Sequence, residues 1–393
     1  MSDPVVIVSA VRTPMGAMLG SLSGLAAYEL GAVAIKAAVE RAGIKGEDVQ
    51  DVIMGNVLQA GQGQAPARQA TLGAGLPQSV AALTIHKVCG SGLKAVMLAH
   101  DMLLAGSADV IVAGGQESMS NAPYLLPKAR QGYRYGHSMM YDHMALDGLE
   151  DAYQRGTAMG VFAELCADKY GFTREQQDAY SIESLRRANQ AISDGSFQWE
   201  IAPVTVKSRV GDVVVDTDEA PLKAKPEKIP SLRPAFKKDG TVTAANASSI
   251  SDGAAALVLM RASTAEKLGV KPLAKVVAHS QYSQAPEWFT TAPVGAIEQC
   301  LSKAGWSKEE VDLYEINEAF AVVTMAAMKE LALDHAKVNI HGGATALGHP
   351  IGASGARILT TLVGALRKTQ GKKGLATLCI GGGEAVALAV EMY

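Results

Sequence analysis

Aromatic side chains are scarce in this sequence, and cysteines are few and scattered. Phe, Trp and Tyr make up 5% of the 393 residues, whereas apolar residues of all kinds make up 48%, and 40 residues are glycine. This balance favours layers of small aliphatic side chains joined by many short turns, rather than a β-sandwich. The four cysteines, Cys89, Cys166, Cys300 and Cys379, form no CxxC pair and no dense disulfide framework. We therefore expect free thiols in a reducing compartment.

Strong charge and long apolar runs are missing as well. The formal net charge of -3 gives no general attraction to nucleic acid. No apolar run reaches the roughly 20 residues that a membrane-spanning helix needs. The segment Met1–Pro4 leads directly into the apolar stretch Val5–Ala10, which leaves no room for a signal or transit peptide. The sequence thus predicts a cytoplasmic protein that binds neither nucleic acid nor membranes.

Common motifs for nucleotides and metals are also missing. No GxGxxG or GxxxxGK[ST] pattern follows a predicted strand, which removes the usual dinucleotide and P-loop sites. Several histidines show no metal-ligand spacing with one another, so no metal site is expected. These are His86, His100, His137, His143, His335 and His341.

An internal duplication organises the chain. Three segments recur about 262 to 267 residues later: Arg41–Val49 as Lys303–Val311, Gly90–Lys94 as Ala353–Arg357, and Gly114–Glu117 as Gly381–Glu384. The chain also exceeds the roughly 250–300 residues at which a single hydrophobic core stops growing. Two similar halves are therefore expected.

Short β-rich runs alternate with helical periods in each half, which favours an α/β fold with a mostly parallel sheet. The predicted strands are Val5–Ala10, Val52–Met54, Val110–Ala113, Ala254–Met260, Leu375–Ile380 and Glu384–Glu391. The predicted helices cover Ala26–Ala38, Leu93–Leu104, Met159–Lys169 and Arg174–Ile192. About 130 residues separate the third and fourth strands, and the matching C-terminal strands are adjacent. We therefore place domain boundaries at 1–117 plus 247–268 for the N-terminal half, 118–246 for an inserted loop domain, and 269–393 for the C-terminal half.

Two cysteines and one histidine stand where apolar runs meet glycine turns. Cys89 directly precedes a predicted helix, whose N-terminal amides should lower the pKa of its thiol. Cys379 precedes the turn Gly381–Gly383, and His349 lies within the glycine-rich segment Gly342–Gly355. These residue types suit a nucleophile, an acid or base, and an orienting group. Cys166 and Cys300 fall on apolar helical faces and are expected in the core.

The three segments around these residues resemble those of the thiolases, and the resemblance extends from Val5–Pro14 to the last predicted strand. It implies the thiolase-like fold, with two duplicated five-stranded βαβαβ-type halves stacked face to face and a loop domain inserted in the first. It also implies that Cys89 accepts the acyl group and that His349 acts as its general base. Cys379 would remove the α-proton of a second acetyl-CoA, a base that the ketoacyl synthases of the same broad fold lack at this position.

The resemblance also implies two oxyanion holes. The N–H groups of Cys89 and Gly381 would form the first. Asn317, in an Asn-Glu-Ala-Phe motif, would hold a water that forms the second together with His349. Ser248 matches the family serine that meets the pantetheine arm of coenzyme A.

Other contacts with coenzyme A and the acyl group are marked less sharply. Lys223 is a candidate for the phosphates, and the other candidates in the binding site are Leu149, Met159, Phe236, Phe289, Ala319 and Phe320. Met159 and Phe289 are bulky and would line the acyl end of the pocket, which favours short acyl groups. The chain departs from some thiolases at Ala158, where those carry a histidine.

The reaction implied is the reversible condensation of two acetyl-CoA to acetoacetyl-CoA and CoA, with coenzyme A thioesters as substrates and no prosthetic group or metal. A β-oxidation thiolase with a broader chain-length range is the alternative within the family, and a non-catalytic CoA-binding scaffold is the alternative from another class. A homotetramer is expected, with Tyr124–Tyr141 as an assembly loop.

Overall fold

The computed structural model describes residues 3–209 and 211–393. Met1 and Ser2, which belong to the segment used to argue against a leader peptide, lie outside the described residues. Within these ranges, no helix is long and apolar enough to cross a membrane.

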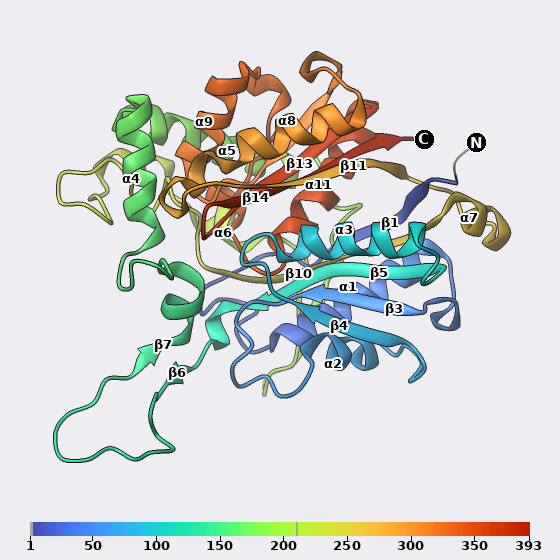
Figure 1. Cartoon of the computed structure of the whole chain (residues 1–393), viewed down its shortest axis with the longest axis horizontal. Helices are drawn as coiled ribbons and strands as arrows, with labels where there is room; N and C mark the ends of the chain where they lie inside the picture. Colours follow the sequence, from blue (N-terminus) through green and yellow to red (C-terminus); the bar gives the residue numbers. More distant parts are fainter. Residues whose placement is uncertain (1–2, 210) are drawn as a thin grey trace.

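The two halves repeat one order of elements, which confirms the duplication (Figure 1). The N-terminal half comprises β1 (Val5–Arg12), the short β2 (Gly16–Ala17), α1 (Ala27–Ala42), β3 (Asp51–Gly55), α2 (Pro66–Gly73), β4 (Ala81–Ile85), α3 (Ser91–Leu104), β5 (Val110–Ser118), β10 (Ser251–Arg261) and α7 (Ala262–Leu268). The C-terminal half comprises β11 (Ala274–Ser283), α8 (Ala292–Ala304), β12 (Leu313–Ile316), α9 (Ala321–Leu331), α10 (Ala344–Leu347), α11 (Ser354–Thr369), β13 (Lys373–Ile380) and β14 (Glu384–Met392). At the place that β4 holds in the first half, the second half has a single parallel bridge between Tyr314 and Val338.

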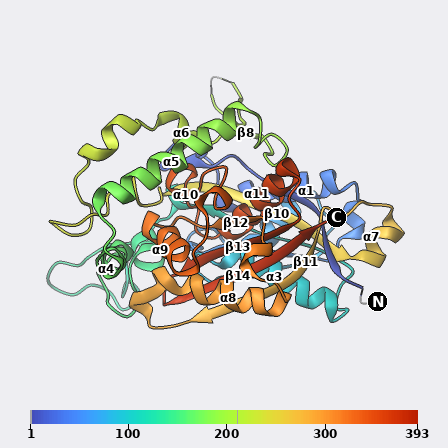
Figure 2. The same cartoon turned by 90° about the horizontal axis from the view of Figure 1, so that it is seen from above.

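The inserted segment forms the helices α4 (Met159–Tyr170), α5 (Arg174–Ser193) and α6 (Glu219–Lys223) and two small hairpins. The hairpins are β6 (Tyr124–Leu125) with β7 (Tyr141–Asp142) and β8 (Val204–Val206) with β9 (Val213–Val215). Thr173 starts α5 with a capping box, since its hydroxyl accepts the Gln176 N–H and the Gln176 side chain accepts the Thr173 N–H. Figure 1 shows the β6–β7 loop projecting away from the body, and Figure 2 shows α5 running along one side of it.

Helices α3 and α11 form a central layer. Three hydrophobic clusters show how the strands pack on this layer and how the remaining helices pack on the strands. Both helices pack with the inner faces of strands from the two halves. Helices α1 and α2 cover the outer face of the N-terminal strands, and α8 and α9 cover that of the C-terminal strands. Strands covered on both faces are buried along almost their whole length, as β1 and β10 show.

The sheet differs from the sequence-based expectation in two respects. It is mixed rather than mostly parallel: β3 pairs parallel with β4 and β5, but β10 and β14 pair antiparallel with both of their neighbours. β14 follows β13 directly after the turn Gly381–Gly383, so the chain returns in the opposite direction. β10 holds the matching place beside β5, with the inserted segment in the connection between them. The halves are also not two separate sheets. In the described residues they join through antiparallel pairing of β1 with β11, in the order β12-β13-β14-β11-β1-β10-β5-β3-β4.

Two glycines let the central helices meet at their first turns. A Cβ atom on Gly92 would lie 2.8 Å from the Ala356 nitrogen, and one on Gly355 would lie 2.3 Å from the Leu93 nitrogen. Any larger residue at either position would separate the helices. This close approach brings the loops before α3 and α11 together.

Candidate active site

The turn before α3 presents Cys89 in a strained conformation. Val88 has a φ of 44°, which is unfavourable for a β-branched side chain. The Ser91 hydroxyl holds the turn, because it donates to the Val88 carbonyl at 2.6 Å and accepts the Lys87 N–H at 2.8 Å. The chain therefore holds a strained backbone at Val88, and this conformation places the Cys89 thiol at the start of α3.

Cys89 is a half-buried residue, and its sulfur accepts a hydrogen bond from the Gly381 N–H of the other half. Burial raises the pKa of the Cys89 thiol to about 11, and the charge of Glu117 adds to this effect. The N–H groups of Gly381 and Cys89 oppose the shift but do not overcome it. The expected lowering of this pKa by the helix N-terminus is therefore wrong, and the thiol needs a base.

His349 supplies an unpartnered ring nitrogen. Its Nδ1 lies 2.5 Å from the Ser354 Oγ, which donates its own proton to the Pro350 carbonyl at 2.9 Å. Nδ1 must then carry the ring proton, which leaves the lone pair on Nε2. Nε2 is buried without a hydrogen-bond partner, and burial together with nearby Arg357 lowers the pKa of His349 to about 3. The imidazole is thus neutral and able to accept a proton.

Cys379 lies deeper than Cys89, at the end of β13. It is fully buried against the side chains of Phe289, Ala319 and Phe320. Burial raises its pKa well above the ordinary value, and proximity to Cys89 raises it further. Cys166 and Cys300 are also fully buried, on α4 and α8, as the sequence predicted.

Asn317 follows β12 and is buried with both its amide nitrogen and its amide oxygen unpartnered. Its backbone N–H is held by the Thr377 carbonyl at 3.0 Å, so the residue is fixed in position. A buried amide with two free polar atoms is suited to bind a water or a substrate oxygen.

Two buried glutamates that sequence reasoning did not assign support these loops. Glu117 accepts hydrogen bonds from the N–H groups of Val57, Leu58 and Gly352 and from the Asn56 amide, and so joins the two halves. Burial raises its pKa to about 7. The internal duplication was the available signal, since it matches Glu117 with Glu384.

Glu318 ties the insert to the loop before His349. Its carboxylate accepts bonds from the hydroxyls of Tyr180, Ser184 and Thr345 and from the Asn339 amide. The Asn-Glu-Ala-Phe motif contained this residue, but its partners lie far apart in the sequence.

A surface ion pair lies beside the two cysteine turns. Lys87 Nζ and Glu384 Oε2 are 2.6 Å apart, and Glu384 also accepts the Ser283 hydroxyl at 3.1 Å. Lys87 precedes Cys89 by two residues, and Glu384 follows the turn that carries Gly381. The pair therefore connects the two turns across the halves.

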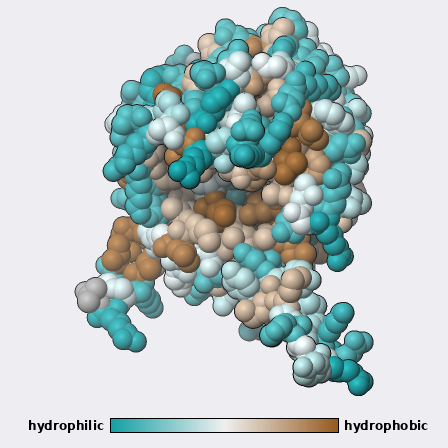
Figure 3. Space-filling view, turned by 90° about the vertical axis from the view of Figure 1, so that its left-hand side faces the viewer, coloured by the Kyte–Doolittle hydropathy of each residue, from teal (hydrophilic) through white to brown (hydrophobic). Residues whose placement is uncertain are grey.

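A cavity of about 660 Å³ is lined by Cys89, His349 and Gly381 among others, and we call it the cysteine cavity. Of the predicted site residues, its lining includes Cys89, Leu149, Met159, Phe236, Ser248, Phe289, Ala319, Phe320, His349 and Gly381. Figure 3, which views the side that carries α4 and the β6–β7 hairpin, shows apolar residues gathered in a hollow. Cys379 and Asn317 lie outside its lining, and Lys223 is exposed on α6 and ion-paired with Glu219.

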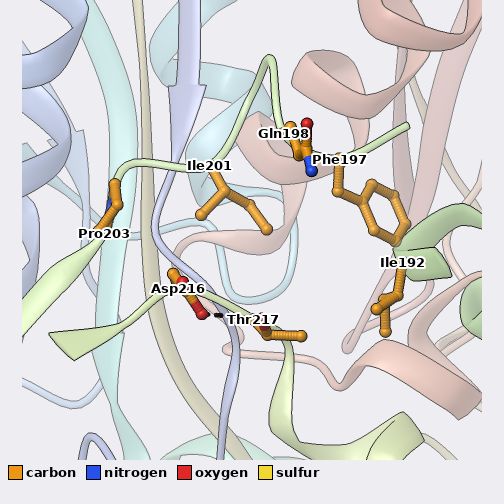
Figure 4. Close-up of a pocket in the computed structure, with 7 residues that line it drawn as sticks. All are labelled: Ile192, Phe197, Gln198, Ile201, Pro203, Asp216 and Thr217. Carbon is orange, nitrogen blue, oxygen red and sulfur yellow. Dashed lines mark hydrogen bonds between the residues drawn. The ribbon is translucent and has the colours of Figure 1, made fainter. Parts of the chain in front are cut away.

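A second hollow, of about 270 Å³, lies between α5 and the following loops (Figure 4). It is lined by Ile192, Phe197, Gln198, Ile201, Pro203, Asp216 and Thr217. Its one carboxylate, Asp216, accepts the Thr217 hydroxyl at 2.9 Å. The Cys89 thiol and the His349 imidazole line the cysteine cavity instead.

Comparisons with known proteins cover the whole chain. Residues 5–263 match the thiolase N-terminal domain and residues 270–392 match the thiolase C-terminal domain. An acetyl-CoA acetyltransferase of Thiocystis violacea is 53% identical over 393 residues, which are all of both chains. Acetyl-CoA acetyltransferase 2 of Arabidopsis thaliana is 53% identical over 391 residues, 99% of this chain and 97% of that protein.

Two solved structures share the fold. A thiolase from Ascaris suum, in complex with coenzyme A, superposes with a TM-score of 0.94 and 44% identity over 99% of this chain and 100% of the other. The acetyl-CoA acetyltransferase of Bacillus anthracis gives a TM-score of 0.97 and 42% identity over 100% of this chain and 99% of the other. Both domain matches, the full-length identities and the shared fold lead to one conclusion: the chain belongs to the thiolase family.

Proposed function

We propose that this chain catalyses the reversible condensation of two acetyl-CoA to acetoacetyl-CoA and CoA. The observation that carries the proposal is the cysteine cavity, where the Cys89 thiol and the free Nε2 of His349 line one apolar space. The acetyl-CoA acetyltransferases that resemble this chain over its full length support the same reaction.

In the first half-reaction, the Cys89 sulfur attacks the carbonyl carbon of acetyl-CoA as its proton passes to Nε2 of His349. The developing oxyanion accepts hydrogen bonds from the N–H groups of Cys89 and Gly381. The C–S bond to coenzyme A then breaks, CoA leaves as the thiol with the proton from His349, and Cys89 holds the acetyl group. His349 is neutral because burial lowers its pKa to about 3, so the lone pair on Nε2 is available for the proton at this step.

In the second half-reaction, the Cys379 thiol gives its proton to Nε2 of His349, and the resulting thiolate removes a proton from the α-carbon of a second acetyl-CoA. The protonated Nε2 of His349 and a water held by Asn317 then donate hydrogen bonds to the enolate oxygen. The enolate carbon attacks the acetyl group on Cys89, the C–S bond to Cys89 breaks, the Cys89 sulfur takes the proton from His349, and acetoacetyl-CoA is released. The unpartnered amide of Asn317 supports its part in this step.

Coenzyme A would enter along the apolar walls of the cysteine cavity. Ser248 would contact the pantetheine arm, and Phe236 and Leu149 would pack on it. These three residues line the cavity, which supports the assignment. Lys223 remains a candidate for the phosphates, although it would have to exchange its ion pair with Glu219.

The cysteine variants test the chemistry. We expect Cys89→Ala to abolish the covalent acetyl-enzyme, whereas Cys379→Ala still forms it but fails to condense. Mass spectrometry after incubation with acetyl-CoA locates the acetyl group, and Cys300→Ala serves as a control because Cys300 is buried away from the cavity on α8. Equal loss of acetylation in both variants would overturn the division of roles, and a wild type that binds coenzyme A but neither acetylates nor condenses would favour a non-catalytic CoA-binding protein.

The acyl chain length distinguishes the reaction from that of a β-oxidation thiolase. Met159 and Phe289 line the cavity, and a Cβ atom on Gly381 would lie only 3.5 Å from the Met159 methyl group. One extra methylene in an apolar pocket changes binding by about 1–3 kcal/mol, so kcat/KM should fall from four-carbon to ten-carbon 3-ketoacyl-CoAs. Met159→Ala should reduce that fall. Equal or rising efficiency with length in the wild type would favour the β-oxidation enzyme.

A homotetramer in the cytoplasm completes the proposal. Tyr135, Met139 and Met140 are exposed on the β6–β7 loop, and Leu83 is exposed on β4. Exposed apolar side chains of this kind are suited to contacts between subunits. The four free thiols agree with a reducing compartment. Sedimentation of the purified chain would test the assembly, and a monomer would contradict it.

A further inference from the structure

Three potential metal ligands meet near the C-terminal end of α3, outside the lining of the cysteine cavity. His100 and Asp101 lie on the last turns of α3, and His279 lies on β11 of the other half. The His100 Nδ1 lies 3.2 Å from the Asp101 Oδ1 and 3.2 Å from the His279 Nε2. The His279 Nε2 lies 2.9 Å from the same carboxylate oxygen.

The three atoms form a nearly equilateral triangle that matches one face of a metal coordination shell. A first-row metal binds nitrogen and oxygen ligands at about 2.0–2.2 Å, so neighbouring ligands of a tetrahedral or octahedral ion are roughly 3.0–3.4 Å apart. The observed edges of 2.9–3.2 Å agree with this range. Within the described residues, His100, Asp101 and His279 are the side chains whose ligand atoms lie close enough together to hold one metal ion.

The surroundings also suit a metal ion. The two imidazoles are mostly buried, with exposed fractions of 12% and 17%, and they meet edge to face, so their positions are fixed. Asp101 is 53% exposed, which leaves a route for the ion and room for water ligands.

Two lysines oppose the binding of a cation. Lys303 donates to the His279 carbonyl at 3.0 Å, and its charge acts on His279. Lys94, one and a half to two turns earlier on α3, acts on Asp101. The positive charges of the two lysines weaken the attraction of the site for a cation. The lysines do not contact the three ligand atoms, which lie against one another.

We propose that His100, Asp101 and His279 bind one divalent first-row metal ion, for which Zn²⁺ is the probe. A set of two imidazoles and one carboxylate is common for this ion, with water completing the coordination. Because α3 belongs to the first half and β11 to the second, the ion would link the halves away from the cysteine cavity. Sequence spacing gave no hint of this site because His279 lies 178 residues from Asp101.

Titration calorimetry with Zn²⁺ tests the site, with Co²⁺ as a spectroscopic probe. We expect one equivalent of Zn²⁺ to bind the wild type, and a hundredfold excess over the dissociation constant to raise Tm by about 2 °C or more. His279→Gln and Asp101→Asn should each weaken binding at least tenfold and keep the basal thiolase activity. His137→Gln, which changes an exposed histidine on the β6–β7 loop, should bind as the wild type does.

Cys89→Ser separates this site from the thiol and imidazole of the cysteine cavity. We expect Cys89→Ser to retain the Zn²⁺ equivalent that His279→Gln loses. Unchanged binding in His279→Gln, or no binding to the wild type, would overturn the proposal. If His279→Gln fails to fold, His100→Gln on α3 provides the same test. A failure here leaves the proposed condensation untouched, because that reaction depends on other residues.

Discussion

The turns before α3 and α11 each use a serine at the matching position, but the two serines have different roles. Ser91 and Ser354 occupy matching positions in the duplicated halves, and both are fully buried. Each donates to a carbonyl in the preceding turn, of Val88 or of Pro350. Ser91 then accepts the Lys87 N–H and shapes the turn of Cys89, whereas Ser354 bonds to the Nδ1 of His349. One local device thus positions a thiol in one half and an imidazole in the other.

The matching glutamates show the same divergence. Glu117 is buried and receives four hydrogen bonds, whereas Glu384 lies at the surface and pairs with Lys87. Both nevertheless join the halves, Glu117 through Gly352 and Glu384 through Lys87. The duplication therefore conserves where the halves meet, while the chemistry of each contact is specific to its half.

The largest effect should come from the asparagine after β12. Asn317→Ala should slow condensation and thiolysis about 10²–10³-fold, because one donor to an oxyanion has this effect on rate. Acetylation of Cys89 and the fold should persist, since no protein group bonds to its side chain. Steady-state rates and a separate acetylation assay measure the two steps.

The neighbouring Asn339 is the matched control for this prediction. It bonds to the Ile316 N–H and carbonyl and to Glu318, so Asn339→Ala should lower stability instead. A fall of less than about threefold in the Asn317→Ala rates would contradict the assigned role.

The two reactive thiols should differ in their response to pH. The pKa of Cys89 is raised to about 11, so its thiolate fraction rises tenfold with each pH unit below that value. Labelling by iodoacetamide should therefore increase about a hundredfold from pH 7 to pH 9, with Cys89 modified before the buried Cys379. Peptide mapping follows both residues. A plateau below pH 8 would mean that the thiolate already forms near neutral pH.

Variants of the two serines should distinguish the positioning of His349 from the shape of the turn that carries Cys89. Ser354→Ala removes one hydrogen bond to His349, and a loss of about 1.4 kcal/mol corresponds to about a tenfold lower kcat. Ser354→Thr retains the hydroxyl and should restore most of the rate. Ser91→Ala should instead lower Tm and the rate of acetylation together. Equal rates for Ser354→Ala and Ser354→Thr would contradict the positioning role.

Much of this arrangement could be predicted from the sequence because the signals are local. The strands β1, β10, β13 and β14 follow apolar runs, and the predicted helices Met159–Lys169 and Arg174–Ile192 match α4 and α5 within one residue at each end. The glycine-flanked positions of Cys89 and His349 also identified residues that meet in one cavity.

Other features depend on contacts that no local pattern encodes. The exposed strand β4 escaped prediction because its alternation is weak, with five residues and no fully buried position. The antiparallel pairing of β1 with β11 depends on how the halves dock. The pKa of Cys89 depends on burial of the thiol in the folded chain, which outweighs the hydrogen bonds from the N–H groups of Gly381 and Cys89. In each case the missing information lies in tertiary packing.

The smallest effect should come from the ion pair between the turns. An exposed pair is worth about 0.2–1 kcal/mol, so Lys87→Met or Glu384→Gln should lower kcat/KM roughly twofold to fivefold. The double variant Lys87→Met/Glu384→Gln should lose little more than either single variant, because both remove the same contact. Lys275 and Glu391, a pair 2.9 Å apart with similar exposure on β11 and β14, provide the control, and Lys275→Met should leave the rate unchanged. Additive losses in the double variant would mean that Lys87 and Glu384 act separately, and the link between the two turns would then rest on the hydrogen bond from Gly381 to Cys89 alone.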